Sequence, residues 1–245
     1  MQRRTLLKAA GGSLLAPTAS PLFAQNQGPV RILIGFAAGG GLDACARLVA
    51  EQLKEAIGRP VVVENKTGAS GRLAVEAVKL APPDGDTLLI APQGPMTLFP
   101  FIYKSLRFDP DKDFTPVTGL ITSDFCLAVG PQAPVSDMTG FKQWAKDAGD
   151  KVTYGSPGAG TIPHFLGVQI ARGLGITMTH IPYRGGGPAV LDLLGGTLSA
   201  VVTPIADPLE MHKAGKVKIL ATTGAARSKL IDGIPTLKES GIDLD

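Results

Sequence analysis

Two glycine-rich segments carry the clearest chemistry in this sequence, and that chemistry belongs to the backbone. The first runs from Gly35 to Asp43 (GFAAGGGLD) and the second from Tyr154 to Thr161 (YGSPGAGT). Glycine lets a chain turn sharply and bring its N–H groups close to a bound group. Each segment leads into a helical pattern, and a helix N-terminus adds unpaired N–H donors and partial positive charge. One such segment alone would suit an ordinary helix entry, but a matched pair favours two turns that bind a carboxylate.

The residues that we expect to bind a ligand come from these two turns and from the ends of neighbouring strands. They are Phe36, Ala37, Ala38, Gly39, Gly40, Asp43, Gln93, Gly94, Ser156, Gly158, Thr161, His164, Tyr183 and Thr203. Gln93-Gly94 and Thr203 follow predicted strands at the edge where α/β sheets bind ligands. Phe36 and Tyr183 could pack on an apolar ligand. A purely structural role remains open for these four positions, and His164 either reaches the ligand or serves as a surface or capping group.

Side chains suited to catalysis or metal binding are sparse. His164, His180 and His212 are scattered, without the spacing of metal ligands. Ser156 lies in Gly-Ser-Pro-Gly, which is not the G-x-S-x-G turn of hydrolases. No paired carboxylates suggest general acid–base chemistry. We therefore expect no catalytic residue, no metal, no cofactor and no enzymatic activity.

A dinucleotide-binding oxidoreductase is the main alternative. The segment from Gly39 to Ala44 satisfies G-x-G-x-x-A, and Glu64 ends the next strand, where a ribose-binding acid would lie. The turn that begins at Phe36 is wider than that fingerprint requires, however, and Asp43 would repel a pyrophosphate. An exported protein would also meet little NAD.

Apolar runs and helical patterns alternate along the chain, as in parallel α/β folds. The expected strands are 30–36, 61–63, 87–91, 151–154, 176–181 and 198–202, and the expected helices are 43–57, 73–80, 141–148, 165–171 and 189–194. The pattern restarts once, which predicts two lobes, with lobe 1 over residues 25–122, lobe 2 over 123–222 and a return into lobe 1 over 223–245. Crossings at Phe114–Val129 and Val217–Gly224 would form a hinge beside a ligand cleft.

The N-terminus predicts export. Residues 1–24 combine Arg3, Arg4 and Lys8 with a short apolar stretch and no acid, which is typical of a signal peptide of general secretory or twin-arginine type. Without these three cations the chain has 21 basic and 21 acidic residues, so its charge gives no footprint for nucleic acid. Cys45 and Cys126 lack metal or C-x-x-C spacing and are expected to be small buried residues rather than a disulfide.

A series of short motifs in this order resembles the receptors of tripartite tricarboxylate transporters, the Bug or TctC-like family. The motifs are Gly35–Asp43, Ala46-Arg47, Gly58–Lys66, Pro83–Gly85, Asp113–Val117, Tyr154–Ser156, His180–Gly185, Asp192–Gly196, Ala214–Lys216 and Ile234–Thr236. The resemblance covers nearly all of the chain after the signal, and the order and spacing of the motifs make it specific.

This resemblance implies a type II periplasmic-binding-protein fold that closes on its ligand like a flytrap. It further implies a periplasmic, monomeric receptor for a di- or tricarboxylate, an acidic amino acid or an aromatic acid, which it delivers to membrane permease subunits; a degenerate receptor used in sensing is a second alternative. Leu42 and Asp86 depart from the family pattern, and without a threonine at position 42 we expect Asp43 to cap its helix alone. Members usually extend beyond the position of Asp245, so we expect the C-terminal part of lobe 1 to be missing.

Overall fold

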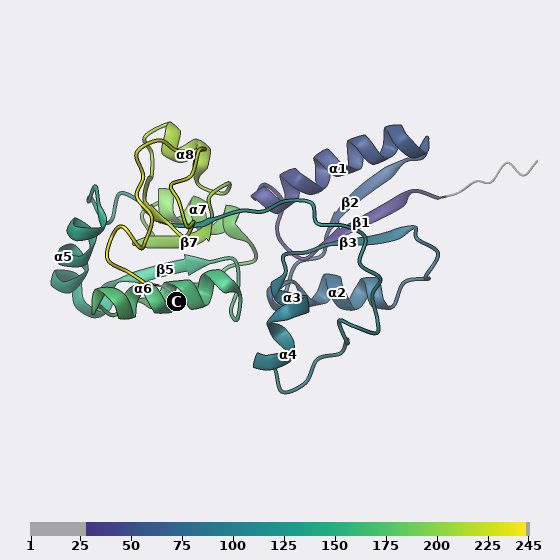
Figure 1. Cartoon of the computed structure of the whole chain (residues 1–245), viewed down its shortest axis with the longest axis horizontal. Coiled ribbons are helices and arrows are strands. Elements are labelled where there is room, and N and C mark those ends of the chain that lie inside the picture. The colour runs from purple at the N-terminus through teal and green to yellow at the C-terminus, as the bar shows by residue number, and fades with distance from the viewer. Residues whose placement is uncertain (1–27, 244–245) are drawn as a thin grey trace, which may run out of the picture.

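A computed structural model describes residues 28–243 of the chain, which form two sheets with helices packed around them (Figure 1). The expected signal over residues 1–24 lies outside the described residues. The order of elements follows the predicted alternation of strands and helices. No helix between residues 28 and 243 has the length and apolar character needed to cross a bilayer.

The first sheet is parallel, with strands in the order β2-β1-β3: β1 (Val30–Ile34), β2 (Val61–Asn65) and β3 (Thr87–Ile90). Its helices are α1 (Gly41–Ile57), α2 (Arg72–Lys79), α3 (Gly94–Thr97) and α4 (Phe99–Ile102), with a short 3₁₀ turn at Ala69–Gly71. We call this part the first lobe; it lies to the right in Figure 1.

Apart from the exposed Arg31, the central strand β1 is apolar and buried, as expected of a strand whose faces are covered. Ile32 and Ile34 pack against Ala46 and Ala50 of α1, whereas Val75 of α2 belongs to a separate cluster on the other side. Helix α1 ends at Gly58, which has φ 66° and donates its N–H to Lys54, as the sequence predicted.

The second sheet has strands in the order β6-β5-β7-β4-β8: β4 (Phe125–Val129), β5 (Thr153–Ser156), β6 (Thr179–Pro182), β7 (Ala200–Pro204) and β8 (Lys218–Thr222). Strand β4 is antiparallel to its neighbours β7 and β8, while β6, β5 and β7 are parallel. The helices of this second lobe are α5 (Met138–Ala148), α6 (Ile162–Leu174), α7 (Gly186–Leu194) and α8 (Leu209–Lys213), with a 3₁₀ turn at Gly149–Lys151.

Side chains of β4 alternate between the two cores of the second lobe, as expected of a strand with both faces buried. Leu127 and Val129 join one core with Phe141, while Cys126 and Ala128 join the other. Both cysteines are free: Cys126 is buried as expected, whereas Cys45 is only partly buried.

The crossing between the lobes differs from the prediction. The chain passes from α4 to β4 through residues 103–124, which contain neither helix nor strand. The second predicted crossing, Val217–Gly224, is wrong within residues 28–243, because that segment forms β8 of the second sheet. The described residues therefore make a single connection between the sheets.

The segment after β8 also differs from the expected return into lobe 1. Thr222 pairs with Thr236, Ile231 packs in one core of the second lobe, and Leu237 and Ile242 pack in the other. Burial of these three apolar side chains keeps the segment up to residue 243 on the second lobe.

Candidate functional site

The two lobes contact each other through hydrogen bonds at three places. The N–H of Ala37 donates to the carbonyl of Arg184 over 2.7 Å. The hydroxyl of Ser70 donates to the carbonyl of Ala159 over 2.6 Å, and the N–H of Gly41 donates to Asp207 Oδ1 over 2.8 Å. In each case the donor comes from the first lobe. The first glycine turn thus contacts Arg184 and Asp207 of the second lobe, and the second glycine turn contacts Ser70 of the first lobe.

A cavity of about 270 Å³ lies between the lobes at this junction. We call it the interlobe cavity. Its walls come from the end of β1, the loop before α2, the second glycine turn and the end of β6: Gly35, Phe36, Gly68, Ala69, Ser70, Gly71, Pro157, Gly158, Ala159, Pro182, Tyr183 and Arg184. Of the predicted binding residues, the cavity thus brings together Phe36, Gly158 and Tyr183.

The loop from Gly68 to Gly71 is a wall of this cavity that the sequence analysis missed. All four residues have positive φ, including Ala69 at 48° and Ser70 at 57°. Side chains disfavour this conformation, and non-glycine residues retain it mainly at functional sites. Successive N–H groups in such a turn can converge on an anion. The available signal was the Gly-x-x-Gly pair between a predicted strand and a predicted helix.

The backbones of the two lobes approach closely because glycines line the junction. A Cβ on Gly158 of the second lobe would lie 2.8 Å from Ser70 Oγ of the first, and within the first lobe a Cβ on Gly35 would overlap the backbone of Gly71. Arg184 is the only charged residue among those that line the cavity. A cavity that is lined by backbone N–H groups and one arginine, without an acidic side chain among the described residues, suits a small anionic ligand.

Asp43 lies beside the first turn but is engaged within its own lobe. Its carboxylate accepts hydrogen bonds from Gly39 N at 3.1 Å, from Asn65 Nδ2 at 2.9 Å and from two nitrogens of Arg47 at 2.9 and 3.0 Å. Burial raises the pKa of Asp43, but these hydrogen bonds outweigh burial and leave the pKa below its usual value. The expectation that Asp43 alone caps α1 is wrong, because Gly40 is the N-cap residue and Asp43 accepts from Gly39, which precedes the helix.

An acid from the second lobe lies instead at the N-terminus of α1. Asp207 accepts from Gly41 N, and Thr203 donates its hydroxyl to the other oxygen of the same carboxylate. Gly186 leaves the room for Asp207, since a Cβ there would overlap the carboxylate. Burial raises the pKa of Asp207 and outweighs the two hydrogen bonds, which lower it. Thr203, a predicted binding residue, is thereby buried behind Asp207 and does not line the interlobe cavity.

The second glycine turn is supported by side chains of its own lobe. Ser156 is fully buried, and its Oγ lies 2.7 Å from His180 Nε2. Thr161 donates its hydroxyl to the carbonyl of Gly158 at 2.7 Å, and Gly160 N donates to His164 Nδ1 at 3.1 Å. Of the predicted residues Ser156, Gly158, Thr161 and His164, only Gly158 lines the cavity, and the other three maintain the shape of the turn.

The Ser156–His180 pair has the spacing of a catalytic serine–histidine pair, but its surroundings do not support acyl transfer. The hydroxyl of Ser156 is enclosed, with Gly158 N and O also within hydrogen-bond distance. Among the described residues His180 has no carboxylate among its hydrogen-bond partners to orient the ring as a base. Residues 28–243 likewise contain no cluster of ligands that could hold a metal ion.

Of the remaining predicted residues, Gln93, Gly94 and Ala38 lie away from the interlobe cavity, whereas Tyr183 lines it. Gln93 precedes α3 and is exposed, and Gly94 is buried near Phe99. Tyr183 lines the cavity, and its hydroxyl donates to Asp192 at 2.6 Å. Burial and this acid raise the pKa of Tyr183. Ala38 is exposed at the tip of the first turn.

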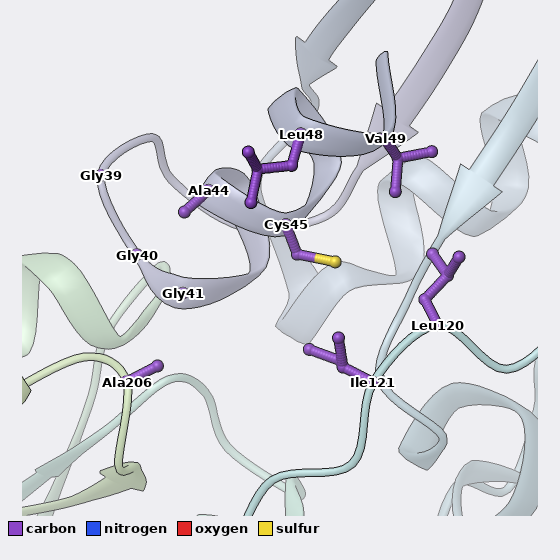
Figure 2. Close-up of a pocket in the computed structure, with 10 residues that line it drawn as sticks. All are labelled: Gly39, Gly40, Gly41, Ala44, Cys45, Leu48, Val49, Leu120, Ile121 and Ala206. Carbon is purple, nitrogen blue, oxygen red and sulfur yellow. The ribbon is translucent and has the colours of Figure 1, made fainter. Parts of the chain in front are cut away.

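Gly39 and Gly40 border a second, larger groove of about 500 Å³, which we call the α1 groove (Figure 2). Leu48 and Cys45 of α1 and Ile121 of the interlobe connection project toward this space in Figure 2. The first glycine turn therefore borders both hollows, and it is held by the second lobe through Arg184 and Asp207.

Comparison with known proteins identifies the family of this chain. Residues 45–244 match the model of the tripartite tricarboxylate transporter family receptor. A UPF0065 protein in the gbd 5' region of Cupriavidus necator is 36% identical over 253 residues, which span 100% of this chain and 76% of that protein.

Solved structures of similar proteins agree with the fold. A protein of R. palustris with adipate has a TM-score of 0.84 at 28% identity, over 89% of this chain and 73% of that one. MatC from Rhodopseudomonas palustris with bound malate has a TM-score of 0.82 at 29% identity, over 89% of this chain and 74% of that one. Adipate and malate are both dicarboxylates.

Proposed function

The chain belongs to the tripartite tricarboxylate transporter receptor family, and we propose that it binds a small dicarboxylate in the interlobe cavity. The observation that carries this proposal is the cavity itself, which combines the strained Gly68–Gly71 backbone with the single charged residue Arg184. Malate and adipate in two similar structures favour a dicarboxylate over the aromatic and tricarboxylic acids that also remained open.

In this proposal backbone N–H groups and Arg184 bind the carboxylates of the ligand. No acidic side chain of residues 28–243 lines the cavity to compete with the ligand for Arg184. The α1 N-terminus is not available, because Gly41 N already donates to Asp207. We assign the ligand instead to the wall formed by Ser70, Gly158 and Tyr183, and the predicted roles of Ser156, Thr161 and His164 become supporting ones.

Family membership indicates a periplasmic solute receptor. We propose that residues 28–122 and 123–243 act as two lobes that close on the ligand, and that the closed form docks on the membrane permease subunits of its transporter. A ligand can favour closure only if its contacts differ between the open and closed states. A ligand in the interlobe cavity would have such contacts, because Ala159 and Arg184 line the cavity and also bond the first lobe. We propose no catalytic step, and the dinucleotide alternative is not favoured because Asp207 at the α1 N-terminus would repel a pyrophosphate.

Thermal unfolding with a panel of acids tests this function. Malate, adipate, succinate, citrate, benzoate and NAD are each added at millimolar concentration, and calorimetric titration follows any hit. A dicarboxylate that binds should raise the melting temperature by mass action, with about 2.7 kcal/mol at a hundredfold excess over Kd. Stabilisation by NAD alone would contradict the proposal.

A further inference from the structure

The second glycine turn is held in place by two histidines from different elements. His164 lies in the first turn of α6 and His180 lies on β6, and their rings stack with centroids 4.0 Å apart and planes inclined by 26°. His164 Nδ1 accepts from Gly160 N at 3.1 Å, and His180 Nε2 lies 2.7 Å from Ser156 Oγ. One histidine therefore supports each end of the turn.

The hydrogen bond from Gly160 requires His164 to be neutral. Since the N–H of Gly160 points at His164 Nδ1, that nitrogen must carry a lone pair, and protonation there removes the hydrogen bond. The contact between His180 and Ser156 fits either protonation state of the ring, because the hydroxyl can donate or accept. Two cationic rings at a centroid distance of 4.0 Å would repel each other across the stack, however, so protonation of the pair also disfavours the position of His180.

The turn between these supports forms part of the interlobe cavity. Gly158 and Ala159 line the cavity, and the carbonyl of Ala159 accepts from Ser70 of the first lobe. Ser156 Oγ accepts from Gly158 N at 3.4 Å, so the serine beside His180 directly positions a cavity residue. A change at the histidines therefore reaches both the ligand and the contact between the lobes.

The groups that face the pair provide no compensating negative charge. Tyr154 of β5 lies with its ring 5.0 Å from His180, and its hydroxyl donates to the carbonyl of His164. Tyr103, after α4, approaches the turn at Ala159, with the guanidinium of Arg72 over its ring. Burial raises the pKa of Tyr154 to about 12, so this hydroxyl stays protonated.

The two rings resist protonation in this setting. Burial, followed by repulsion from His164, lowers the pKa of His180 to about 4. Burial also lowers the pKa of His164. No carboxylate contributes to either shift. Once the turn loosens and water reaches the rings, both should titrate near the ordinary value of about 6.5.

We propose that His164 and His180 are positioning residues that keep the second turn in its ligand-binding shape only while both rings are neutral, so that acidification releases the ligand. This inference rests on the proposed function, because the ligand is assigned to the cavity that the turn lines.

The pH dependence of the ordered turn follows from the linkage between proton binding and the shape of the turn. Because the pair binds protons more weakly in the ordered turn than in the loosened turn, the ordered form is favoured most above about pH 6.5. Its advantage declines as the pH falls from about 6.5 toward the value of about 4 for His180. Ligand affinity should decline over the same window.

A double variant that cannot titrate separates this effect from others. His164→Asn places an amide oxygen where Nδ1 accepts from Gly160, and His180→Gln places an amide near Ser156. His212→Asn is the matched control, since His212 Nδ1 also accepts from a backbone N–H, that of Ile219 at 3.2 Å, but lies on α8 outside the cavity. The probes are malate and adipate, titrated by calorimetry at pH 7.5, 6.5 and 5.0.

The ligand's own protonation is the same for every variant, so comparison isolates the pair. We expect the Kd of the wild type to rise between pH 7.5 and 5.0 by about tenfold more than that of the double variant. The His212→Asn control should follow the wild type. An equal pH dependence of wild type and double variant overturns the proposal. Tighter binding by the wild type at low pH also overturns it, because the histidines would then bind the ligand directly as cations.

A measurement without ligand distinguishes failure of this inference from failure of the proposed function. Amide exchange at Gly158 and Gly160, corrected for the intrinsic effect of pH, should become faster in the wild type below pH 6.5 but not in the double variant. If neither acid binds at any pH, the proposed function fails while exchange still decides the role of the pair. Unchanged exchange overturns the inference even if both acids bind.

Discussion

Hydrogen-bond partners, rather than residue types, decide what each polar side chain near the junction does. Asp43 and Asp207 are both acids beside the first glycine turn, yet Asp43 binds Arg47 of its own helix and Asp207 binds the N-terminus of a helix in the other lobe. Asp43 has a lowered pKa and Asp207 a raised one. Of these two acids, Asp207 is therefore the one that links the lobes. The sequence pointed to Asp43 instead, because Asp43 lies inside the first glycine-rich segment.

Arg47→Met tests the role of Asp43 as a structural anchor. The substitution leaves a carboxylate that is 5% exposed without its strongest partner, and buried charges need partners. We expect the melting temperature at pH 7 to fall by about 2–4 °C. Calorimetry on the variant and the wild type provides the measurement.

The control and the pH dependence sharpen this prediction. Arg31→Met removes an equivalent ion pair whose side chains are 46% and 39% exposed, so it should have little effect. Because the pKa of Asp43 is lowered in the folded state, its contribution is complete above about pH 4 and is lost as the pH falls through the folded value. A difference between Arg47→Met and the wild type that does not shrink as the pH falls below about 4 would contradict the assignment.

Elements were predicted best where a regular pattern repeats over several turns. Helix α1 and strand β1 were located from their apolar patterns, including the end of the helix at Ile57. Strands β5 and β6 begin later than predicted, at Thr153 and Thr179. The 3₁₀ turn at Gly149–Lys151 occupies the start of the first of these, and such short elements have no periodic signal.

The segment after β8 is the element whose position the sequence misplaced. Its apolar residues are few and irregular, so nothing local indicated which lobe would bury them. Leu237 is 1% exposed in the core of the second lobe.

Leu237→Ala tests that assignment. We expect a loss of about 2–5 kcal/mol in the free energy of unfolding, which is the usual cost of a large cavity in a core. Leu230→Ala in the same segment is the control, because Leu230 is 62% exposed and should change stability little. Urea denaturation measures both. Similar values for the two variants would show that the segment is not anchored to the second lobe.

At the scale of the whole molecule, closure brings backbones of the two lobes into direct contact. Gly158 packs on Ser70 across the junction, and an added Cβ would lie 2.8 Å from its hydroxyl oxygen. In the proposed closing motion this contact forms only when the lobes are closed, so a methyl group there should oppose closure without disturbing either core.

Gly158→Ala should therefore weaken dicarboxylate binding by about tenfold or more while leaving the melting temperature of the free protein nearly unchanged. Small-angle scattering with saturating malate should show less compaction than for the wild type. Gly119→Ala is the control, because a Cβ at that position of the interlobe connection meets no atom within 4 Å. Full affinity in Gly158→Ala would show that the closed contact at Ser70 is not part of binding.

The sequence by itself determined the order of strands and helices, the two glycine turns and the likeness to a receptor family, because these depend on local periodicity and on backbone freedom within a few residues. Only the tertiary structure decided which N–H groups already have a partner. Asp207 reaches Gly41 from 166 residues away, His180 supports a turn that begins at Ser156, and the strained Gly68–Gly71 loop lines the interlobe cavity beside a few of the predicted residues. These outcomes depend on how two lobes pack against each other, and no pattern within a single segment specifies that packing.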